Sequence, residues 1–284
     1  MPDFSDITKR IKKLTYDTVI ETGFAPKVDQ IADEIKISKD EVKSSLHDLE
    51  GGIIVALQNK AHENIDTFMG EELPGDTVLP QIGEIFYARP FSNFKNHQRV
   101  YVNDQQKWYA ECSLEATSLS NFFPGKEVIV RSVCAHTKEP VELIQKDGIL
   151  LDYKPKALMI FVGLPLRKWL SDGDLIAPCD NNRIFASTDA YYEWIKCHRD
   201  IRGCLIHPIE ANRMIRMIAY GRTRFDYRLR LPLLRFIVQY PTMGLTKTFL
   251  GIPLFFNTYW LPGLSLIKNM MKYKYRPFIE IRLL

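Results

Sequence analysis

The sequence lacks the motifs that commonly mark nucleotide-binding and hydrolytic enzymes. It contains no glycine-rich loop that would cradle a phosphate, no Ser-His-Asp order and no His-Glu-x-x-His segment. It also has no charged-then-apolar leader after Met1, because lysine and arginine residues interrupt residues 7–20. Secretion is therefore not indicated, and we expect a cytoplasmic protein.

Cysteine is scarce and irregularly spaced. The 284 residues include 5 cysteines, at Cys112, Cys134, Cys179, Cys197 and Cys204. An odd number of scattered cysteines does not indicate a disulfide framework, and in a reducing compartment such residues are thiols. The sequence therefore allows a function that rests on sulfur.

Charge is distributed unevenly along the chain. The formal net charge is +4, but the residues after 204 carry thirteen Lys/Arg and three Asp/Glu, a net +10, which leaves −6 for residues 1–204. We therefore treat residues 208–284 as a distinct basic, apolar and aromatic C-terminal extension. Its uncharged stretch 249–267 has the length of a membrane span, but its glycines and prolines argue against a regular spanning helix. Peripheral contact with a lipid surface remains an alternative, and we favour packing against the acidic remainder of the chain or a second subunit.

Residues 1–60 have the element order of a winged-helix-like domain. Apolar residues at helical spacing predict three helices, Ser38 and Glu41 form a capping box before the third, and a strand is expected at 53–57. This shape often reads DNA. However, the segment holds nine Lys/Arg and eleven Asp/Glu, so it offers no basic footprint for phosphates. We expect no nucleic-acid binding here, and a structural, lid or dimerisation role instead.

The pattern changes after the linker or loop that we expect at 61–89. Short alternating segments separated by turn residues predict strands, and helices are expected after Ser113, at 166–170 and at 189–198. The expected strands are 99–102, 107–110, 126–133, 141–144, 149–153 and 158–162. The sequence thus predicts an α+β fold with a mostly antiparallel sheet, and a second domain at 90–207.

One segment places a thiol one helical turn before a carboxyl group. It reads Lys107-Trp-Tyr-Ala-Glu-Cys112-Ser-Leu-Glu115-Ala116, at an expected strand-to-helix junction. Residues three apart share a helix face, and a cysteine at a helix N-terminus experiences a positive partial charge that favours the thiolate. The segment therefore predicts a soft nucleophile beside a proton donor.

Two further segments hold cysteines in patterned surroundings. They are Ser132-Val-Cys134-Ala-His-Thr-Lys-Glu-Pro-Val141 and Pro178-Cys179-Asp-Asn-Asn-Arg-Ile-Phe-Ala-Ser187, the latter leading into Tyr191-Tyr-Glu-Trp194. Together with the first segment, they resemble in order and spacing the organomercurial (alkylmercury) lyases. That family is similar in having W/Y-A-x-C-x-L-D, then C-A-x-T-x-x-P-V, then a Cys shortly before F-A-S and a Trp-containing helix. It also has a winged-helix-like N-terminal domain, so the resemblance extends over residues 5–205.

The resemblance implies a lyase that cleaves a carbon–mercury bond to give a hydrocarbon and Hg(II), without an organic cofactor. The family's first and third cysteines bind mercury as substrate and product, and an acidic residue supplies the proton. These roles correspond to Cys112, Cys179 and Glu115. The chemistry is consistent, because soft thiolates bind soft metals and a nearby carboxylic acid can protonate the released carbon. Cys112 and Cys179 should then converge on one metal ion. In mercury resistance and detoxification, a mercuric reductase would accept the Hg(II).

Two residues depart from the family pattern. The family's acid is usually Asp, whereas Glu115 is one methylene longer, and the residue before the first cysteine is commonly aromatic, whereas here it is Glu111. A carboxylate facing a thiol would raise the pKa of that thiol, and Glu111 is the first alternative proton donor. A non-catalytic, thiol-dependent metal-binding or regulatory protein of the same fold is the alternative function.

The remaining cysteines have simpler interpretations. Cys134 follows an apolar strand pattern and is expected to be a buried packing residue. Cys197, His198, Cys204 and His207 offer four potential zinc ligands, but their spacing does not match the paired motifs of structural zinc sites. We therefore expect no zinc there.

Overall fold

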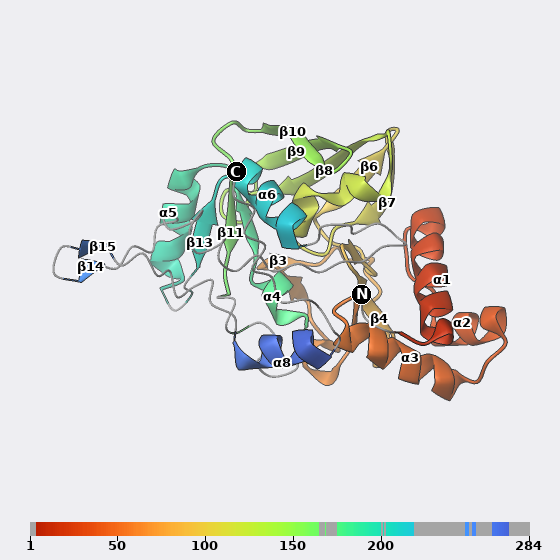
Figure 1. Cartoon of the computed structure of the whole chain (residues 1–284). Coiled ribbons are helices and arrows are strands. Elements are labelled where there is room, and N and C mark those ends of the chain that lie inside the picture. Colours follow the sequence, from red (N-terminus) through yellow and green to blue (C-terminus); the bar gives the residue numbers. More distant parts are fainter. Residues whose placement is uncertain are drawn as a thin grey trace, which may run out of the picture.

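Three helices and a short strand begin the chain in the computed structural model, which describes residues 4–164, 168, 175–199, 201, 203–218, 248–249, 252–253 and 263–272 (Figure 1). The elements are α1 (Asp6–Thr22), α2 (Val28–Ile35), α3 (Lys39–Gly51) and β1 (Val55–Leu57). The predicted order of three helices and a strand is confirmed. The predicted capping box is also present: the Ser38 hydroxyl accepts from the Glu41 backbone N–H (3.2 Å), and the Glu41 carboxylate accepts from the Ser38 backbone N–H (3.0 Å).

The end of α1 packs closely against the strand that leads to Cys112 and is hydrogen-bonded to it. Gly23 ends the helix at φ 94°, and a Cβ there would lie 2.2 Å from the backbone oxygen of Lys107, so only glycine fits. One residue further along that strand, the Trp108 indole N–H donates to the Val19 carbonyl oxygen (2.8 Å). The N-terminal helices therefore support the segment that carries the first thiol.

A small antiparallel sheet in the order β1-β4-β5 packs beside these helices, with β4 at Ile85–Ala88 and β5 at Phe91–Ser92. The expected linker or loop at 61–89 thus ends in a buried strand. The one-turn 3-10 helix η1 (Lys60–His62) overlaps the start of this segment. The segment also contains the short hairpin of β2 (Thr67–Phe68) and β3 (Glu71–Glu72). The sequence pattern missed β4 because all four of its side chains are buried, so no polar–apolar alternation marks it.

The main sheet is antiparallel, with five strands in the order β10-β9-β8-β6-β7. Each was predicted to within a few residues, since most alternate buried and exposed side chains. The strands are β6 (Arg99–Val102), β7 (Gln105–Tyr109), β8 (Glu127–Val133), β9 (Pro140–Lys146) and β10 (Ile149–Lys154). The expected mixture of helices with an antiparallel sheet is therefore confirmed.

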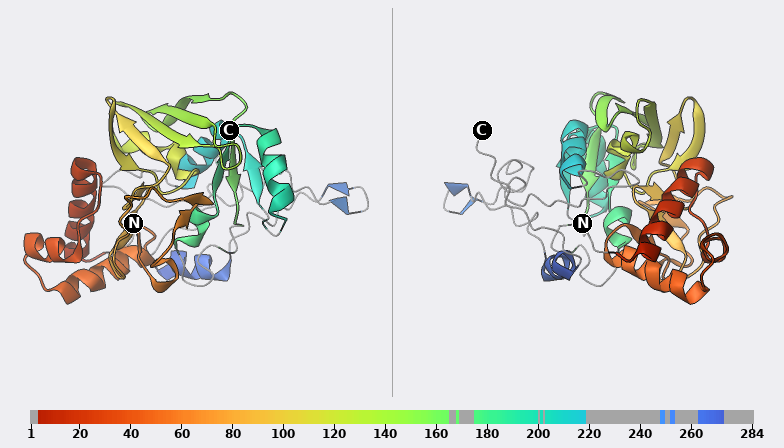
Figure 2. Two further views of the ribbon diagram at one scale, coloured as in Figure 1. Left: turned by 180° about the vertical axis from the view of Figure 1, so that it is seen from behind. Right: turned by 45° about the vertical axis from the view of Figure 1, so that its right-hand side comes forward.

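The segment that contains Cys179 leads into a third antiparallel sheet, in the order β12-β11-β13. Its strands are β11 (Met159–Val162), β12 (Arg183–Phe185) and β13 (Cys204–Ile206), accompanied by α4 (Ala177–Asp180) and α5 (Thr188–Cys197). The helix predicted at 189–198 corresponds to α5, whereas the helix predicted at 166–170 lies outside the described residues apart from Lys168. Figure 2 shows α1–α3 at one end of the molecule and α5 with this sheet at the other.

The first residues of the expected C-terminal extension belong to the core. Helix α6 (Pro208–Ile218) packs on β10, β11 and the 3-10 helix that follows Cys112, and it buries Ala211, Met214 and Ile215. Asn212 donates to the carbonyl oxygens of Thr117 (2.7 Å) and Gly148 (3.0 Å). Beyond α6, the described residues are β14 (Thr248–Phe249), β15 (Ile252–Pro253) and α8 (Leu264–Lys272). Most of the extension beyond α6 lies outside the described ranges, and its predicted docking stays a prediction. Within those ranges, every helix is too short or too polar to cross a bilayer.

Replacing Asn212 by alanine should destabilise the fold by about 1–3 kcal/mol, because two buried carbonyl oxygens would lose their donor. Urea denaturation of the full chain measures this change. Arg213→Ala is the control on the same helix, since its exposed ion pair with Glu210 should be worth less than about 0.5 kcal/mol. Equal effects of the two substitutions would contradict the role given to Asn212.

Candidate functional site

The two cysteines expected to bind mercury lie on different segments, a loop and a short helix, and both are in the interior. Cys112 lies in the loop between β7 and the 3-10 helix η2 (Glu115–Thr117), and Cys179 lies on α4. Their exposed fractions are 1% and 3%. Asn182 connects them, since its Nδ2 donates to Cys112 Sγ (3.3 Å) and its backbone N–H donates to the Cys179 carbonyl oxygen (3.1 Å). Cys112 is also near enough to raise the pKa of the Cys179 thiol. The structure therefore brings together two thiols that are 67 positions apart in the sequence.

In place of the helix expected after Ser113, the structure has two short 3-10 helices, η2 (Glu115–Thr117) and η3 (Leu119–Phe122). The Ala116 backbone N–H donates to the Cys112 carbonyl oxygen (2.8 Å), and η2 covers only three residues. So short a turn aligns few peptide dipoles, which means that the expected stabilisation of a Cys112 thiolate by a helix N-terminus does not apply. The environment of the thiols must instead come from side chains.

A buried carboxylate and a buried guanidinium provide this environment. The Cys179 thiol donates to Glu111 Oε1 (2.8 Å), and Arg89 Nη1 donates to the same oxygen and contacts Cys179 Sγ (3.6 Å). Arg89 follows β4, and its Nη2 also donates to the Leu175 carbonyl oxygen (2.6 Å), just before α4. Glu111 is completely buried. The sequence marked Glu111 only as a departure from the family pattern, and it gave no signal for Arg89.

Two further polar side chains border the thiols. Asn182, after α4, donates through Nδ2 to Cys112 Sγ (3.3 Å), and its Oδ1 is buried without a hydrogen-bond partner among the described residues. The hydroxyl of Tyr87 is likewise buried and unpartnered within the described part of the chain. Burial raises the pKa of Tyr87 well above its ordinary value, and the nearby Cys179 and Glu111 raise it further.

Burial also controls the ionisation of Cys179. It raises the pKa of the Cys179 thiol well above its ordinary value, the adjacent Cys112 and Glu111 add to this effect, and Arg89 opposes it. The resting thiol therefore keeps its proton near neutral pH and donates it to the Glu111 carboxylate. A soft metal that binds this sulfur must displace that proton.

Glu115, the predicted proton donor, is also buried. It has an exposed fraction of 5% and lies on η2, one turn beyond Cys112. Two interior carboxyl groups, Glu111 and Glu115, thus flank Cys112 in the sequence. Of the two, Glu111 accepts a hydrogen bond from the Cys179 thiol (2.8 Å).

The other cysteines lie apart from this arrangement. Cys134 is buried after β8, where its sulfur accepts from the Thr137 backbone N–H (3.4 Å), in keeping with a packing role. Cys204 is buried on β13, and burial raises its pKa to about 12. Cys197 is exposed at the end of α5. Across the described ranges, no group of three or more His, Cys, Asp or Glu residues is arranged to hold a metal ion.

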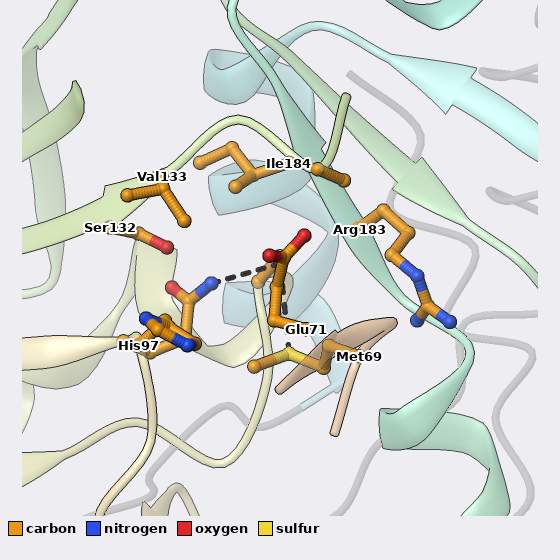
Figure 3. A pocket seen from close by; sticks show the side chains of 10 residues that line it. Met69, Glu71, His97, Ser132, Val133, Arg183 and Ile184 are labelled. Atoms are coloured by element: carbon orange, nitrogen blue, oxygen red, sulfur yellow. Dashed lines mark hydrogen bonds between the residues drawn. The ribbon is translucent and has the colours of Figure 1, made fainter. Parts of the chain in front are cut away.

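A small pocket lies beside the loop that carries Cys112 (Figure 3). Ser113 lines it and accepts from the Gln98 side-chain amide (3.3 Å). Arg183, the residue after Asn182, also lines it, and burial lowers the pKa of its guanidinium while Asp180 and Glu71 oppose that effect. Gly70 leaves room for Arg183, since a Cβ there would lie 2.8 Å from the Nε atom.

Comparison with known proteins connects this site to a family. Residues 91–220 match the family model described as alkylmercury lyase, and this segment includes Glu111, Cys112, Glu115 and Cys179. The resemblance that the cysteine motifs indicated is thereby confirmed.

Solved structures extend the similarity to the fold. Among them is the crystal structure of the mercury-bound form of MerB2, with a TM-score of 0.50 and 17% sequence identity, covering 74% of this chain and 89% of that one. At this identity the likeness concerns the fold. A comparison with curated proteins gave no match.

Replacing Cys179 by serine should weaken the pH dependence of stability in alkaline solution. The folded-state pKa of this thiol lies above its ordinary value of 9.0, so the stability it contributes is complete below about pH 9 and is lost as the pH rises further. The loss has a slope of at most about 1.4 kcal/mol per pH unit. Urea denaturation between about pH 8 and 10 measures it. Cys197→Ser, at an exposed thiol, is the control, and identical slopes for wild type and Cys179→Ser would contradict the prediction.

Proposed function

We propose that the protein is an organomercurial lyase that captures an alkylmercury group with two thiolates and replaces mercury by a proton on the carbon. The observation that supports this proposal best is the meeting of Cys112 and Cys179 in a buried site, within the segment that matches the alkylmercury lyases. Two thiols are the ligand set that a soft, low-coordinate metal prefers.

The proposed reaction balances with the groups present. The substrate R–Hg–X and two cysteine thiols give R–H, a mercury dithiolate and HX. One thiol proton leaves with X, and the other must reach the carbon. Two thiolates increase the electron density on that carbon, and a carboxylic acid close by transfers the proton as a general acid. The buried position of both sulfurs removes competing water from the mercury centre.

Two carboxyl groups are candidates for the proton transfer. Glu115 has the position of the acid in the family motif, three residues after Cys112. Glu111 is favoured by its contact, because it already accepts the hydrogen bond of the Cys179 thiol (2.8 Å) and is thus placed to receive the proton released when mercury binds. We assign the role to Glu115 as the motif implies, with Glu111 as the competing donor.

The alternative function is a metal-binding or regulatory protein of the same fold that holds mercury or another soft metal without cleaving a carbon–metal bond. It would use the same two cysteines.

As a lyase, the protein would deliver Hg(II) to an acceptor such as a mercuric reductase. Residues 1–60, which hold α1–α3 and β1, would form a winged-helix-like domain with a structural, lid or dimerisation role, since their net charge of −2 does not favour binding to DNA.

Replacement of either thiol by serine should abolish cleavage. Cys112→Ser and Cys179→Ser each leave one sulfur, which cannot form the dithiolate, so release of benzene from a phenylmercury salt should fall to the uncatalysed rate. Gas chromatography of the hydrocarbon measures turnover. The control is Cys134→Ser, a buried thiol outside the site. Cleavage by either single-site variant at the wild-type rate would refute the proposed function, and mercury binding without any hydrocarbon release by the wild type would favour the alternative.

Glu115→Gln should retain mercury binding and lose cleavage by about 10²- to 10⁴-fold, the usual effect of removing a general acid. Glu111→Gln, an equally isosteric change at the neighbouring carboxyl group, is the matched comparison. If Glu111→Gln produces the large loss while Glu115→Gln turns over normally, the proton role passes to Glu111. Single-turnover assays with stoichiometric mercury binding separate the loss of chemistry from the loss of binding.

A further inference from the structure

Cys179 lies on an element that is too short to position it. Helix α4 has only four residues, and an isolated turn of this length is not stable by itself. Contacts from other segments must therefore fix the direction of the Cys179 sulfur. The structure provides them on both sides of the helix: Arg89 binds the Leu175 carbonyl oxygen before it (2.6 Å), and the Met69 backbone N–H binds Asp180 Oδ1 at its end (2.8 Å).

Arg89 joins three separate segments through one guanidinium. Its Nη2 holds the chain that enters α4, and its Nη1 reaches Glu111 in the loop of Cys112 and the sulfur of Cys179. It extends from the end of β4, where the Pro90 carbonyl oxygen also accepts from the Glu111 backbone N–H (2.8 Å). The side chain is buried, with the guanidinium carbon 5.9 Å from the centre of the Tyr87 ring.

From these contacts we infer that Arg89 is the positioning residue of the dithiol: it holds the Cys179 segment against the Cys112 loop so that both sulfurs reach one mercury ion. The inference rests on the proposed function, and it adds a residue that no cysteine motif contains. It also explains why position 89 holds an arginine and not a lysine. A lysine ammonium is a single point of charge, whereas the planar fork of arginine can serve Leu175 with one nitrogen and Glu111 with the other.

The consequence concerns how mercury is held. Two thiols fixed side by side bind one ion as a chelate. The second bond then forms within the same molecule, which raises the overall affinity for the ion by about 10²- to 10⁴-fold. Two thiols that are no longer fixed relative to each other bind mercury one at a time, and a competing small thiol removes it. Arg89 should therefore determine the retention of mercury, beyond any effect on folding.

The test uses the full-length protein loaded with one equivalent of Hg(II) and challenged with glutathione. Wild type should retain the ion, with the ultraviolet absorption of a mercury dithiolate and with both thiols protected from alkylation. Arg89→Met, which keeps the length and removes the donors, should retain mercury about 10²-fold less well. Arg89→Lys should restore only part of the retention. Arg131→Met is the control, because Arg131 pairs with Glu142 across β8 and β9.

Thermal unfolding of each variant separates positioning from folding. A folded Arg89→Met protein with wild-type retention and absorption would overturn the inference. Should that variant fail to fold, Arg89→Lys decides, and full retention in the lysine variant would equally overturn it. These outcomes differ from failure of the proposed function, in which Cys112→Ser or Cys179→Ser would cleave a phenylmercury salt at the wild-type rate.

Discussion

The ion pair between Arg89 and Glu111 is the interaction on which the rest of the site depends. Both groups are buried, and removing two charges from water costs several kcal/mol per ion unless each finds a close partner and further hydrogen bonds. Here the further bonds go to the Leu175 carbonyl oxygen and to the Cys179 thiol. The cost of burying the pair is thus offset by contacts that assemble the site. Loss of either partner would leave a bare charge among apolar neighbours, so the pair can vary only as a unit.

The same pair keeps the interior close to electrical neutrality in both states of the proposed cycle. In the resting state, a protonated Cys179 is consistent with its raised pKa, and the carboxylate and the guanidinium cancel each other. In the product state, two thiolates cancel the charge of Hg(II), and the ion pair again contributes nothing net. A buried site that stays neutral needs no entry of counterions, which agrees with a location that water barely reaches. This charge balance is what the proposed function requires of a site that takes up a divalent ion.

The predictability of this structure from sequence followed the range of the interactions involved. Helices α1–α3 and the capping box at Ser38 are local, and the strands of the main sheet have alternating side chains. The order of the helices could therefore be predicted, and the strands to within a few residues. Strand β4 was missed because burial on both faces erased the alternation. The turn after Cys112 was predicted as a helix, yet it closes as a 3-10 turn within a well-packed loop. The thiols could be paired through a family resemblance. Arg89 could not, because nothing near it in the sequence points to Leu175 or Cys179.

The contrast between buried and exposed cysteines affects how the amount of mercury bound by the protein should be measured. Cys197 stands at the surface, whereas Cys112 and Cys179 are enclosed. A mercury reagent added in excess reacts first with the Cys197 sulfur and forms a single, readily exchanged bond there. A simple titration therefore includes mercury bound at Cys197 as well as mercury bound by Cys112 and Cys179. The ion that survives extensive washing, and not the total taken up, is therefore the quantity that reports on the enclosed pair.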